Sequence, residues 1–304
     1  MKRPATISER TCPACGGQTG LDQGQKNSFL LLSCTTCSTL YTAQSTEGGH
    51  RQDYDDYYTS TNLTIPSFID KRLDEIVATF ETYRQNNRLL DIGCGAGSFL
   101  QAAARDNWEA FGLEVSQSAI QHVRSLGFEV FHGELNQADY PDGYFDVVVA
   151  SEILEHLPNP RGLLRSISRI LRPGGLFWAT TPHGRGISAR ILGVRWTTVS
   201  PPEHLQLFSV PGIKALLSSA GFSHMNVATH GTNPFEIVHA MRHKASRPTE
   251  NGSEPPTNFN RVESSYQLNE FLSEKPLRRI VKATLNGLLN AGRIGDSLKI
   301  RAER

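Results

Sequence analysis

The sequence predicts an α/β protein with an open, largely parallel sheet, preceded by a small cysteine-bearing module. Three observations favour this fold class. A short apolar strand at residues 88–92 runs into a loop with three alternate glycines, and a helical segment begins directly behind it. Further apolar strands alternate with helical segments as far as residue 230, which is typical of strand–helix–strand units. Two Cys-x-x-Cys pairs precede this region.

The glycine loop at residues 93–97, with the sequence GCGAG, predicts a bound nucleotide-like ligand. Glycine allows the backbone to turn tightly and to approach a ligand without a Cβ in the way. The N-terminus of the following helix offers N–H groups and positive potential to a carboxylate or phosphate. A dinucleotide fingerprint would need glycine or alanine three places after Gly95, where this chain has Ser98. A dinucleotide-binding domain is the alternative that the loop alone leaves open.

The other strands of the predicted sheet follow in order along the chain. Apolar runs place them near residues 110–115, 128–131, 144–151, 175–181 and 222–230. The first of these runs ends in an acid, Glu114, where a ribose diol would be held. Residues 297–301 alternate as a strand does, and we expect them to pair beside the strand at 222–230. Residues 231–295 are therefore predicted to be an insertion.

Helices are expected at three further places. Apolar residues recur on one face of residues 67–85, and a helix at 210–220 ends at Gly221, a predicted C-cap. A third helix begins near residue 276 with an apolar and a basic face. Its residues 276–289 could lie on an anionic membrane. The alternative is a helix packed on the sheet or above the substrate pocket.

Five blocks of sequence carry a resemblance to a known family. They are, in order, LLDIGCGAG, GLEVS, GEL, FDVVVASEILEHL and LRPGG. With these blocks the chain resembles the class I S-adenosylmethionine-dependent methyltransferases over about residues 65–230, in the style of the branch with the ubiquinone-biosynthesis O-methyltransferases. The resemblance implies a Rossmann-like seven-stranded sheet with a terminal antiparallel hairpin. It also implies S-adenosyl-L-methionine as the cofactor, lying across the strand ends.

The resemblance further implies donor-binding roles for residues at these strand ends. The methionine side of the pocket would be shaped by Asp91, Gly93, Gly95 and Gly97. Glu114 would accept both ribose hydroxyls, because a carboxylate suits two adjacent O–H donors. Glu134 and Leu135 would flank the adenine, and Ser151 would lie against the methionine tail.

One basic residue is expected to meet the methionine carboxylate of the donor. Lys71 and Arg72 lie about twenty residues before the glycine loop, and either side chain could reach that carboxylate. The alternative is that both belong to the solvated face of the helix at 67–85.

Four of the five cysteines predict a structural metal site. Cys12 and Cys15 form one pair, Cys34 and Cys37 the other, with 18 residues between the pairs. Four thiolates close the tetrahedral shell of a zinc ion and leave no position for substrate, so the ion would be structural. Two disulfides, which a reducing compartment disfavours, or chance pairing are the alternatives. Cys94, in the glycine loop, is expected to be a small packed side chain.

Length, charge and composition bound the remaining possibilities. The 304 residues are expected to form a zinc ribbon at 1–45, a linker at 46–64 and a methyltransferase domain at 65–304. The net charge of +1 gives no field that would attract nucleic acid. No apolar run reaches the length of a membrane span, and the N-terminus lacks the apolar core of a signal peptide. We therefore expect a cytoplasmic enzyme; the oligomeric state is left open.

Three histidines are candidates for the catalytic base. An alcohol or phenol acceptor must lose a proton, and an imidazole titrates near neutrality. His156 lies in the block after the fourth strand, and the alternative is that it orders its own loop. His183 follows the fifth strand, and His204 lies in the segment Pro-Pro-Glu-His-Leu; either could bind or deprotonate an acceptor. Trp196, Tyr57 and Tyr58 could line the acceptor pocket; the alternative is that these aromatic side chains only pack.

The acceptor class separates three functional hypotheses. The first is methylation of a small molecule such as a sugar, a lipid precursor or a secondary metabolite. The second is methylation of RNA with the zinc ribbon as the binding module, although residues 8–45 carry only Arg10 and Lys26 as basic residues. The third is a donor-binding scaffold without turnover. The sequence favours the first and does not decide whether oxygen, nitrogen or carbon receives the methyl group.

Overall fold

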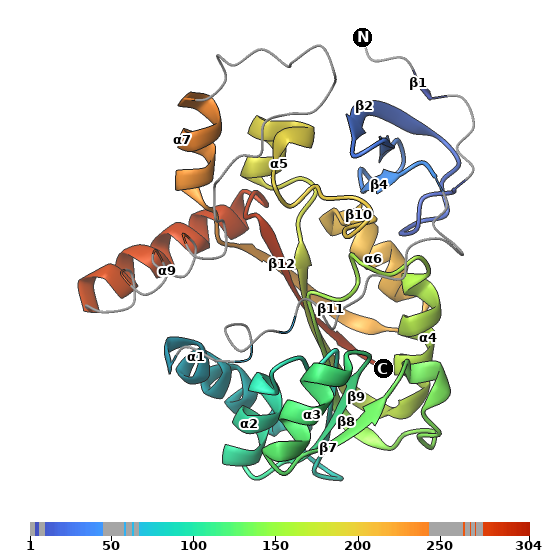
Figure 1. Cartoon of the computed structure of the whole chain (residues 1–304), viewed down its shortest axis with the longest axis vertical. Helices are drawn as coiled ribbons and strands as arrows, with labels where there is room; N and C mark the ends of the chain where they lie inside the picture. The colour runs from blue at the N-terminus through green and yellow to red at the C-terminus, as the bar shows by residue number, and fades with distance from the viewer. Residues whose placement is uncertain are drawn as a thin grey trace.

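Two sheets organise the chain (Figure 1). The structure, a computed structural model, describes residues 4–5, 10–44, 58, 63, 67–242, 264, 268, 271 and 276–304. Most of the predicted linker at 46–64 and most of the segment between 243 and 275 lie outside the described residues. Within the described part, no helix is both long and apolar enough to cross a bilayer.

The larger sheet has seven strands in the spatial order β11-β12-β9-β8-β5-β6-β7. Its strands are β5 (Arg88–Ile92), β6 (Glu109–Glu114), β7 (Glu129–His132), β8 (Phe145–Ser151), β9 (Leu171–Pro182), β11 (Ser223–His230) and β12 (Ser297–Glu303). Five of them run parallel, from β9 across to β7. β12 inserts antiparallel between β9 and β11, so the predicted seven-stranded sheet with a terminal hairpin is confirmed.

Helices cover both faces of this sheet. They are α1 (Ser67–Ala78), α2 (Ser98–Arg105), α3 (Gln117–Ser125), α4 (Pro160–Ile170) and α6 (Val210–Ser219). On β8, Val147 and Val149 pack in the core that contains α1 and α2, whereas Val148 and Ala150 pack in the core that contains α4 and α6. All four side chains are fully buried, which explains why β8 is a continuous apolar run rather than an alternating one.

The predicted helix at 67–85 is shorter than expected. α1 ends at Ala78, and a separate 3-10 turn, η1, spans Glu81–Tyr83. Thr79 is the reason, because both its amide and its hydroxyl donate to the carbonyl of Ile76, at 3.0 and 2.6 Å. These bonds tighten the last turn and end the α-helical pattern.

The smaller sheet has the order β1-β2-β3-β4-β10 and contains strands from distant parts of the chain. They are β1 (Pro4–Ala5), β2 (Gly20–Lys26), β3 (Phe29–Cys34), β4 (Leu40–Thr42) and β10 (Gln206–Leu207). β10 lies between β9 and α6 in the sequence and pairs antiparallel with β4. A shared core joins the two parts, in which Leu31 and Leu40 pack with Trp196. The cysteine module is therefore built onto the larger domain.

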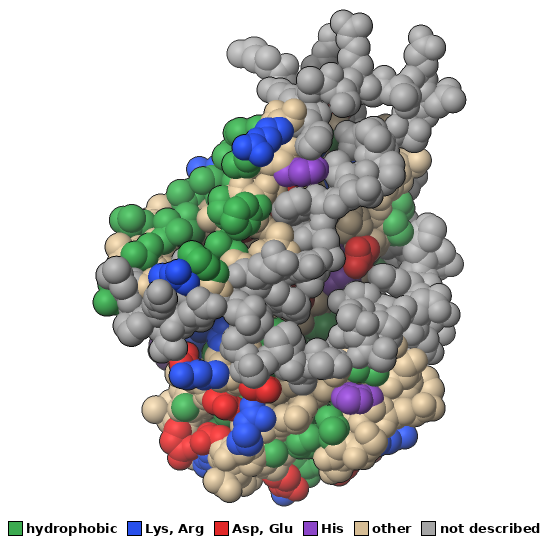
Figure 2. Space-filling view, turned by 60° about the vertical axis from the view of Figure 1, so that its left-hand side comes forward, with side chains coloured by type: hydrophobic (Ala, Val, Ile, Leu, Met, Phe, Trp, Pro, Cys, Tyr) green, Lys and Arg blue, Asp and Glu red, His purple; other side chains and the backbone are tan. Residues whose placement is uncertain are grey.

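The segment predicted as an insertion contains α7 (Pro234–Arg242) and α9 (Pro276–Ala291), and α5 (Ile187–Leu192) lies nearby in Figure 1. α9 is attached to β11 through its C-terminal end, where Leu289 is buried and its carbonyl accepts from the Thr229 hydroxyl at 2.9 Å. The expected apolar face is largely exposed, at Ile280, Val281, Leu285 and Leu288. Hydrophobic and basic side chains gather on this side of the molecule (Figure 2). Membrane contact by this helix stays a prediction.

Candidate functional site

The glycine loop between β5 and α2 adopts a conformation that requires glycine. Gly93, Gly95 and Gly97 have φ values of +68°, +51° and +77°, which L side chains rarely adopt. The amide of Gly93 donates to the carbonyl of Leu113 on β6 at 2.7 Å. A Cβ at Gly93 would also overlap Cδ1 of Ile153, which belongs to the block after β8. The loop is therefore packed directly against the segment that contains the candidate base His156.

Glu114 lies at the end of β6 and holds the glycine loop in place. Its buried carboxylate accepts the amide of Gly95 at 2.9 Å and the amides of Val115 and Ser116 at 2.7 and 3.0 Å. A carboxylate offers about four acceptor positions, so three are filled by main chain. Asp91, buried on the adjacent strand, has a pKa raised well above its usual range by burial and by the charge of Glu114.

Other predicted donor-side residues lie at the same edge of the sheet. Ser151 ends β8, and its hydroxyl is 2.9 Å from that of Thr180 on β9. Glu134 and Leu135 follow β7, where Glu134 is exposed and Leu135 is buried. Burial raises the pKa of the Cys94 thiol, consistent with the packed side chain that we expected.

Two further residues approach this edge from outside the sheet. Arg72 lies on α1, where desolvation of its guanidinium lowers its pKa and the charge of the Glu152 carboxylate opposes that shift. Tyr58, predicted to line the acceptor pocket, lies against the glycine loop, where its hydroxyl would be 2.8 Å from a Cβ at Gly95. Tyr57 lies outside the described residues. Trp196 was also expected at the acceptor pocket, but it is buried in the core beside the cysteine module.

The structure brings two of the three candidate histidines together. The rings of His156 and His204 are 4.7 Å apart and inclined by 70°. Nδ1 of His156 lies 3.0 Å from the carbonyl of Glu203, and Nδ1 of His204 lies 2.6 Å from the carbonyl of Thr198. Burial and the neighbouring His204 lower the pKa of His156 to about 4. The segment before β10 therefore fixes both rings through its main-chain carbonyls.

A buried carboxylate completes this cluster. Oε1 of Glu155 is 4.0 Å from Nε2 of His156, and Oε2 accepts the hydroxyl of Thr181 at 2.9 Å. Within the described part of the chain, Oε1 has no hydrogen-bond partner although it is inaccessible to solvent. Burial and the charge of Glu152 raise the pKa of Glu155 well above its usual range. Sequence analysis missed Glu155; an acid directly before a candidate base was the signal available.

His183 lies outside the cluster of Glu155, His156 and His204. Its ring is buried, and Nδ1 is 2.8 Å from the carbonyl of Gly295 before β12. Burial lowers its pKa to about 4. These contacts link the end of β9 to the start of β12. The environment of His183 is therefore that of a buried structural residue.

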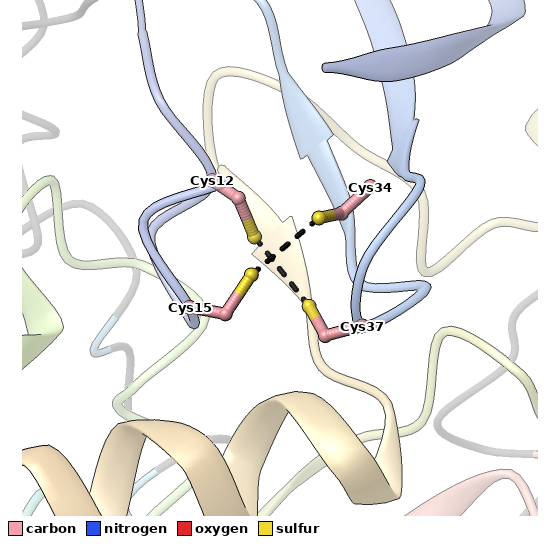
Figure 3. A group of neighbouring side chains, drawn as sticks. All are labelled: Cys12, Cys15, Cys34 and Cys37. Atoms are coloured by element: carbon pink, nitrogen blue, oxygen red, sulfur yellow. Dashed lines mark hydrogen bonds between the residues drawn. The ribbon is translucent and has the colours of Figure 1, made fainter. Parts of the chain in front are cut away.

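The four predicted cysteine ligands converge on one point (Figure 3). The Sγ atoms of Cys12 and Cys37 are 3.6 Å apart, and those of Cys15 and Cys34 are 3.5 Å apart. Four sulfurs at about 2.3 Å from a tetrahedral zinc ion would be roughly 3.8 Å from one another, so the residues fit the ion. A disulfide needs about 2.05 Å, which neither pair approaches.

Gln206 on β10 links the cysteine module to the histidine cluster. Its side-chain amide donates to the carbonyls of Leu154 and Leu157, at 2.6 and 2.9 Å. Its side-chain oxygen accepts from the guanidinium of Arg10 at 2.6 Å. The hydroxyl of Ser209 also donates to the carbonyl of Cys37. Gln206, held by Arg10 of the module, therefore contacts the backbone on both sides of Glu155.

Comparisons with known proteins agree with this geometry. A family described as methyltransferase domain matches residues 65–227. A ubiquinone biosynthesis O-methyltransferase of Methylococcus capsulatus is 32% identical over 114 residues, which are 35% of this chain and 48% of that protein. A probable S-adenosylmethionine-dependent methyltransferase of Mycolicibacterium smegmatis is 30% identical over 166 residues, 52% of this chain and 63% of that protein.

A solved structure supports the fold independently. A methyltransferase from Archaeoglobus fulgidus, described as dependent on S-adenosylmethionine, has a TM-score of 0.52 at 18% identity, covering 83% of this chain and all of that one. The sequence matches span about half to three-fifths of the curated relatives' own length. Because the family match covers more than half of the residues, the chain belongs to the methyltransferase domain family, as a class I S-adenosylmethionine-dependent member.

Proposed function

We propose that this protein transfers a methyl group from S-adenosyl-L-methionine to a hydroxyl group of a small-molecule acceptor. The observation that carries the proposal is the contact between the donor loop and the histidine cluster. Ile153 packs against Gly93, and three residues later His156 faces His204. Donor and acceptor must be held in line at near-contact distance, and this adjacency supports such an arrangement.

On the donor side, Glu114 would bind the ribose. Three of its acceptor positions are filled by amides, so a ribose diol would have to use the remaining position and share or displace the bond from Gly95. Arg72 would meet the methionine carboxylate, an assignment supported by its charge near the strand end of β8. Glu134 and Leu135 would flank the adenine, and Ser151 the methionine tail.

On the acceptor side, the cluster after β8 would handle the hydroxyl group. The acceptor oxygen forms a bond to the methyl carbon while the sulfur–methyl bond breaks, and the sulfur keeps the bonding electron pair. The hydroxyl proton must leave, which gives polar groups at this edge a role. We assign this role to His156 and His204, because their rings lie together after β8. The buried ring of His183, bonded to the carbonyl of Gly295, favours a structural role for that histidine.

The contacts of the cysteine module favour a small acceptor over RNA. Its described basic side chains are Arg10 and Lys26, and both are bonded to the larger domain. Arg10 binds Gln206, and Nζ of Lys26 donates to the carbonyl of Trp196 at 3.0 Å. A surface that binds a phosphate backbone would need cations that face outward. The four-cysteine site would be structural, because four thiolates fill the tetrahedral shell of the ion.

Two measurements test the proposal. Calorimetry with S-adenosylhomocysteine should give one donor site per chain, and Glu114→Ala should weaken binding at least tenfold. Incubation with donor labelled in the methyl group and with separate pools of hydroxylated small molecules, RNA and protein should label only the small molecules. Label in the RNA pool would replace this proposal with a nucleic-acid methyltransferase. Donor binding without label transfer to any pool would leave a scaffold.

A further inference from the structure

Strands β11 and β12 carry half-buried basic side chains at the edge of the sheet where the donor is expected. Lys299 on β12 is directly opposite Thr180 on β9, whose hydroxyl is 2.9 Å from that of Ser151. On the other side, Lys299 is opposite Ala228, and His230 follows two residues later at the end of β11. Opposite residues, and residues two apart in one strand, share a face of the sheet. Lys299 and His230 are therefore on one face, beside Thr180.

Helices α1 and α9 border this face of the sheet. Nζ of Lys299 lies 5.9 Å from the ring centroid of Trp178, which packs in the core with α1 and α2. α9 runs along the outer edge of β11, where Oδ1 of Asn286 accepts the amide of Gly231 at 3.0 Å. Lys282 is four residues before Asn286 and is therefore on the same side of the helix. Figure 1 shows α1 and α9 on the same side of β12.

The basic groups are close enough to act on one another. Burial lowers the pKa of His230 to about 4, and the charges of Arg72, Lys299 and Lys282 add to this shift. Burial also lowers the pKa of Lys299, and the charges of Arg72 and Arg301 lower it further. Within the described part of the chain, no carboxylate pairs with the Lys299 ammonium. Like charges gathered in a half-buried place are unfavourable unless an anion joins them.

Unpartnered polar atoms beside these cations supply an independent observation. Nδ1 of His230, Oγ1 of Thr232 and Nε1 of Trp178 are inaccessible to solvent, and no hydrogen-bond partner for them exists among the described residues. Buried polar groups in folded proteins normally have a partner, so three such atoms near one another indicate a bound molecule. An indole N–H can only donate, and a hydroxyl and a neutral imidazole can each donate one hydrogen bond. Cations and donors together suit the oxygens of an anion.

We propose that Lys299 and His230 bind a carboxylate or phosphate group of the methyl acceptor, with Lys282 adding positive charge. This inference rests on the proposed function and narrows its acceptor to negatively charged small molecules. An anion on Lys299 would lie beside Thr180, and so next to Ser151, where the methionine tail of the donor is proposed. A charged group held away from the reacting hydroxyl would position that hydroxyl near the methyl group.

The donor alone would leave these basic groups without a counter-charge. Its single carboxylate is assigned to Arg72, on which the charges of Glu152 and Glu75 also act. Its ammonium and sulfonium groups bring further positive charge to the same edge of the sheet. The charge of Glu75 reaches Lys282 as well, but no acid among the described residues acts on Lys299. The acceptor must therefore supply the negative charge.

The test titrates inorganic phosphate and acetate into the full-length, zinc-loaded protein saturated with S-adenosylhomocysteine. The NMR signal of the indole N–H of Trp178 should shift, and those of the other two tryptophans, Trp108 and Trp196, should not. Lys299→Met keeps an apolar stem over the indole ring and should weaken anion binding at least tenfold, whereas Lys299→Arg should restore most of it. Lys214→Met, at an exposed lysine on α6, is the matched control and should bind like the wild type. The tighter of the two anions identifies the charged group of the acceptor.

Absence of the Trp178 shift, or equal loss of binding in Lys299→Met and Lys214→Met, would overturn the proposal. Calorimetry should show unchanged affinity of Lys299→Met for S-adenosylhomocysteine, which also shows that the variant is folded. If that affinity falls while the affinity for methylthioadenosine, which lacks the amino-acid part, is unchanged, the basic groups bind the donor carboxylate and the proposal is wrong.

Methyl transfer separates failure of this inference from failure of the proposed function. With donor labelled in the methyl group, the wild type should label small hydroxy acids or their phosphate counterparts at least tenfold more than the matching neutral esters, and Lys299→Met should lose this preference. Equal labelling of charged and neutral acceptors would refute the inference and leave the proposed function intact. Labelling of no small molecule would refute the proposed function itself.

Discussion

Glu114→Gln is the sharpest test of the donor site. The substitution keeps the shape of the side chain but replaces one carboxylate oxygen by an NH2 group. With the amide oxygen towards Val115 and Ser116, the NH2 group faces the amide of Gly95, which loses its acceptor at 2.9 Å. A buried donor left unpaired costs about 1–3 kcal/mol, and the charge repulsion relieved at Asp91 offsets part of it.

We therefore expect a net loss near 2 kcal/mol, which lowers the melting temperature by roughly 5 °C in a domain of this size. The dissociation constant of S-adenosylhomocysteine should rise about 10- to 100-fold, because the ribose loses a charged acceptor. Thermal denaturation and calorimetry measure the two effects separately. Glu129→Gln, at an exposed position on the adjacent strand β7, is the control and should change neither. Unchanged affinity together with a lower melting temperature would reduce Glu114 to a structural role.

Three further perturbations follow from the same structure. Gly93→Ala should lower the affinity for S-adenosylhomocysteine at least tenfold, because alanine disfavours the positive φ at this position and its Cβ would overlap Cδ1 of Ile153. Adding Ile153→Val should restore part of the affinity. No recovery in the double variant would contradict the contact between Gly93 and Ile153. The pKa of His183 is about 4 in the folded protein, compared with 6.5 for an ordinary histidine in the unfolded chain. The unfolded chain therefore binds a proton first as the pH falls. The free energy of unfolding decreases by up to about 3 kcal/mol between pH 6.5 and pH 4. Urea denaturation of His183→Asn should show a shallower loss, and parallel slopes would refute this. Removal of zinc by a chelator should shift the tryptophan emission to longer wavelength, because Trp196 packs on the cysteine module. The substitution Trp196→Phe should abolish this shift. An unchanged spectrum in the wild type would argue against the metal.

The sequence predicted the sheet well because its signals are local. Each predicted strand of the larger sheet overlaps an observed one, and the apolar run of β8 is correct to within one residue. β9 begins at Leu171 rather than near 175, because Leu171 pairs with Phe145 before a register shift in the ladder. The four cysteines were found by spacing alone, and their sulfurs do converge.

What the sequence could not predict depends on contacts between distant segments. Glu155 and His204 are separated by 48 intervening residues, and only the path of the chain from β9 to β10 brings them together. β10 itself has two residues, too few to show a period, and it exists because β4 offers an open edge. The exposure of Leu285 and Leu288 on α9 was likewise invisible, because an apolar face in a sequence does not say what covers it.

The pairing of β4 with β10 has a consequence for dissecting the molecule. A version beginning after residue 44 would lose the neighbour of β10, the shared core around Trp196 and the arginine that holds Gln206. The backbone around Leu154 and Leu157 would then lack its anchor on one side. Trimming the first 44 residues would thus disturb the acceptor side before it disturbed the donor loop, and inactivity of such a fragment could not be taken as evidence that those residues recruit the substrate.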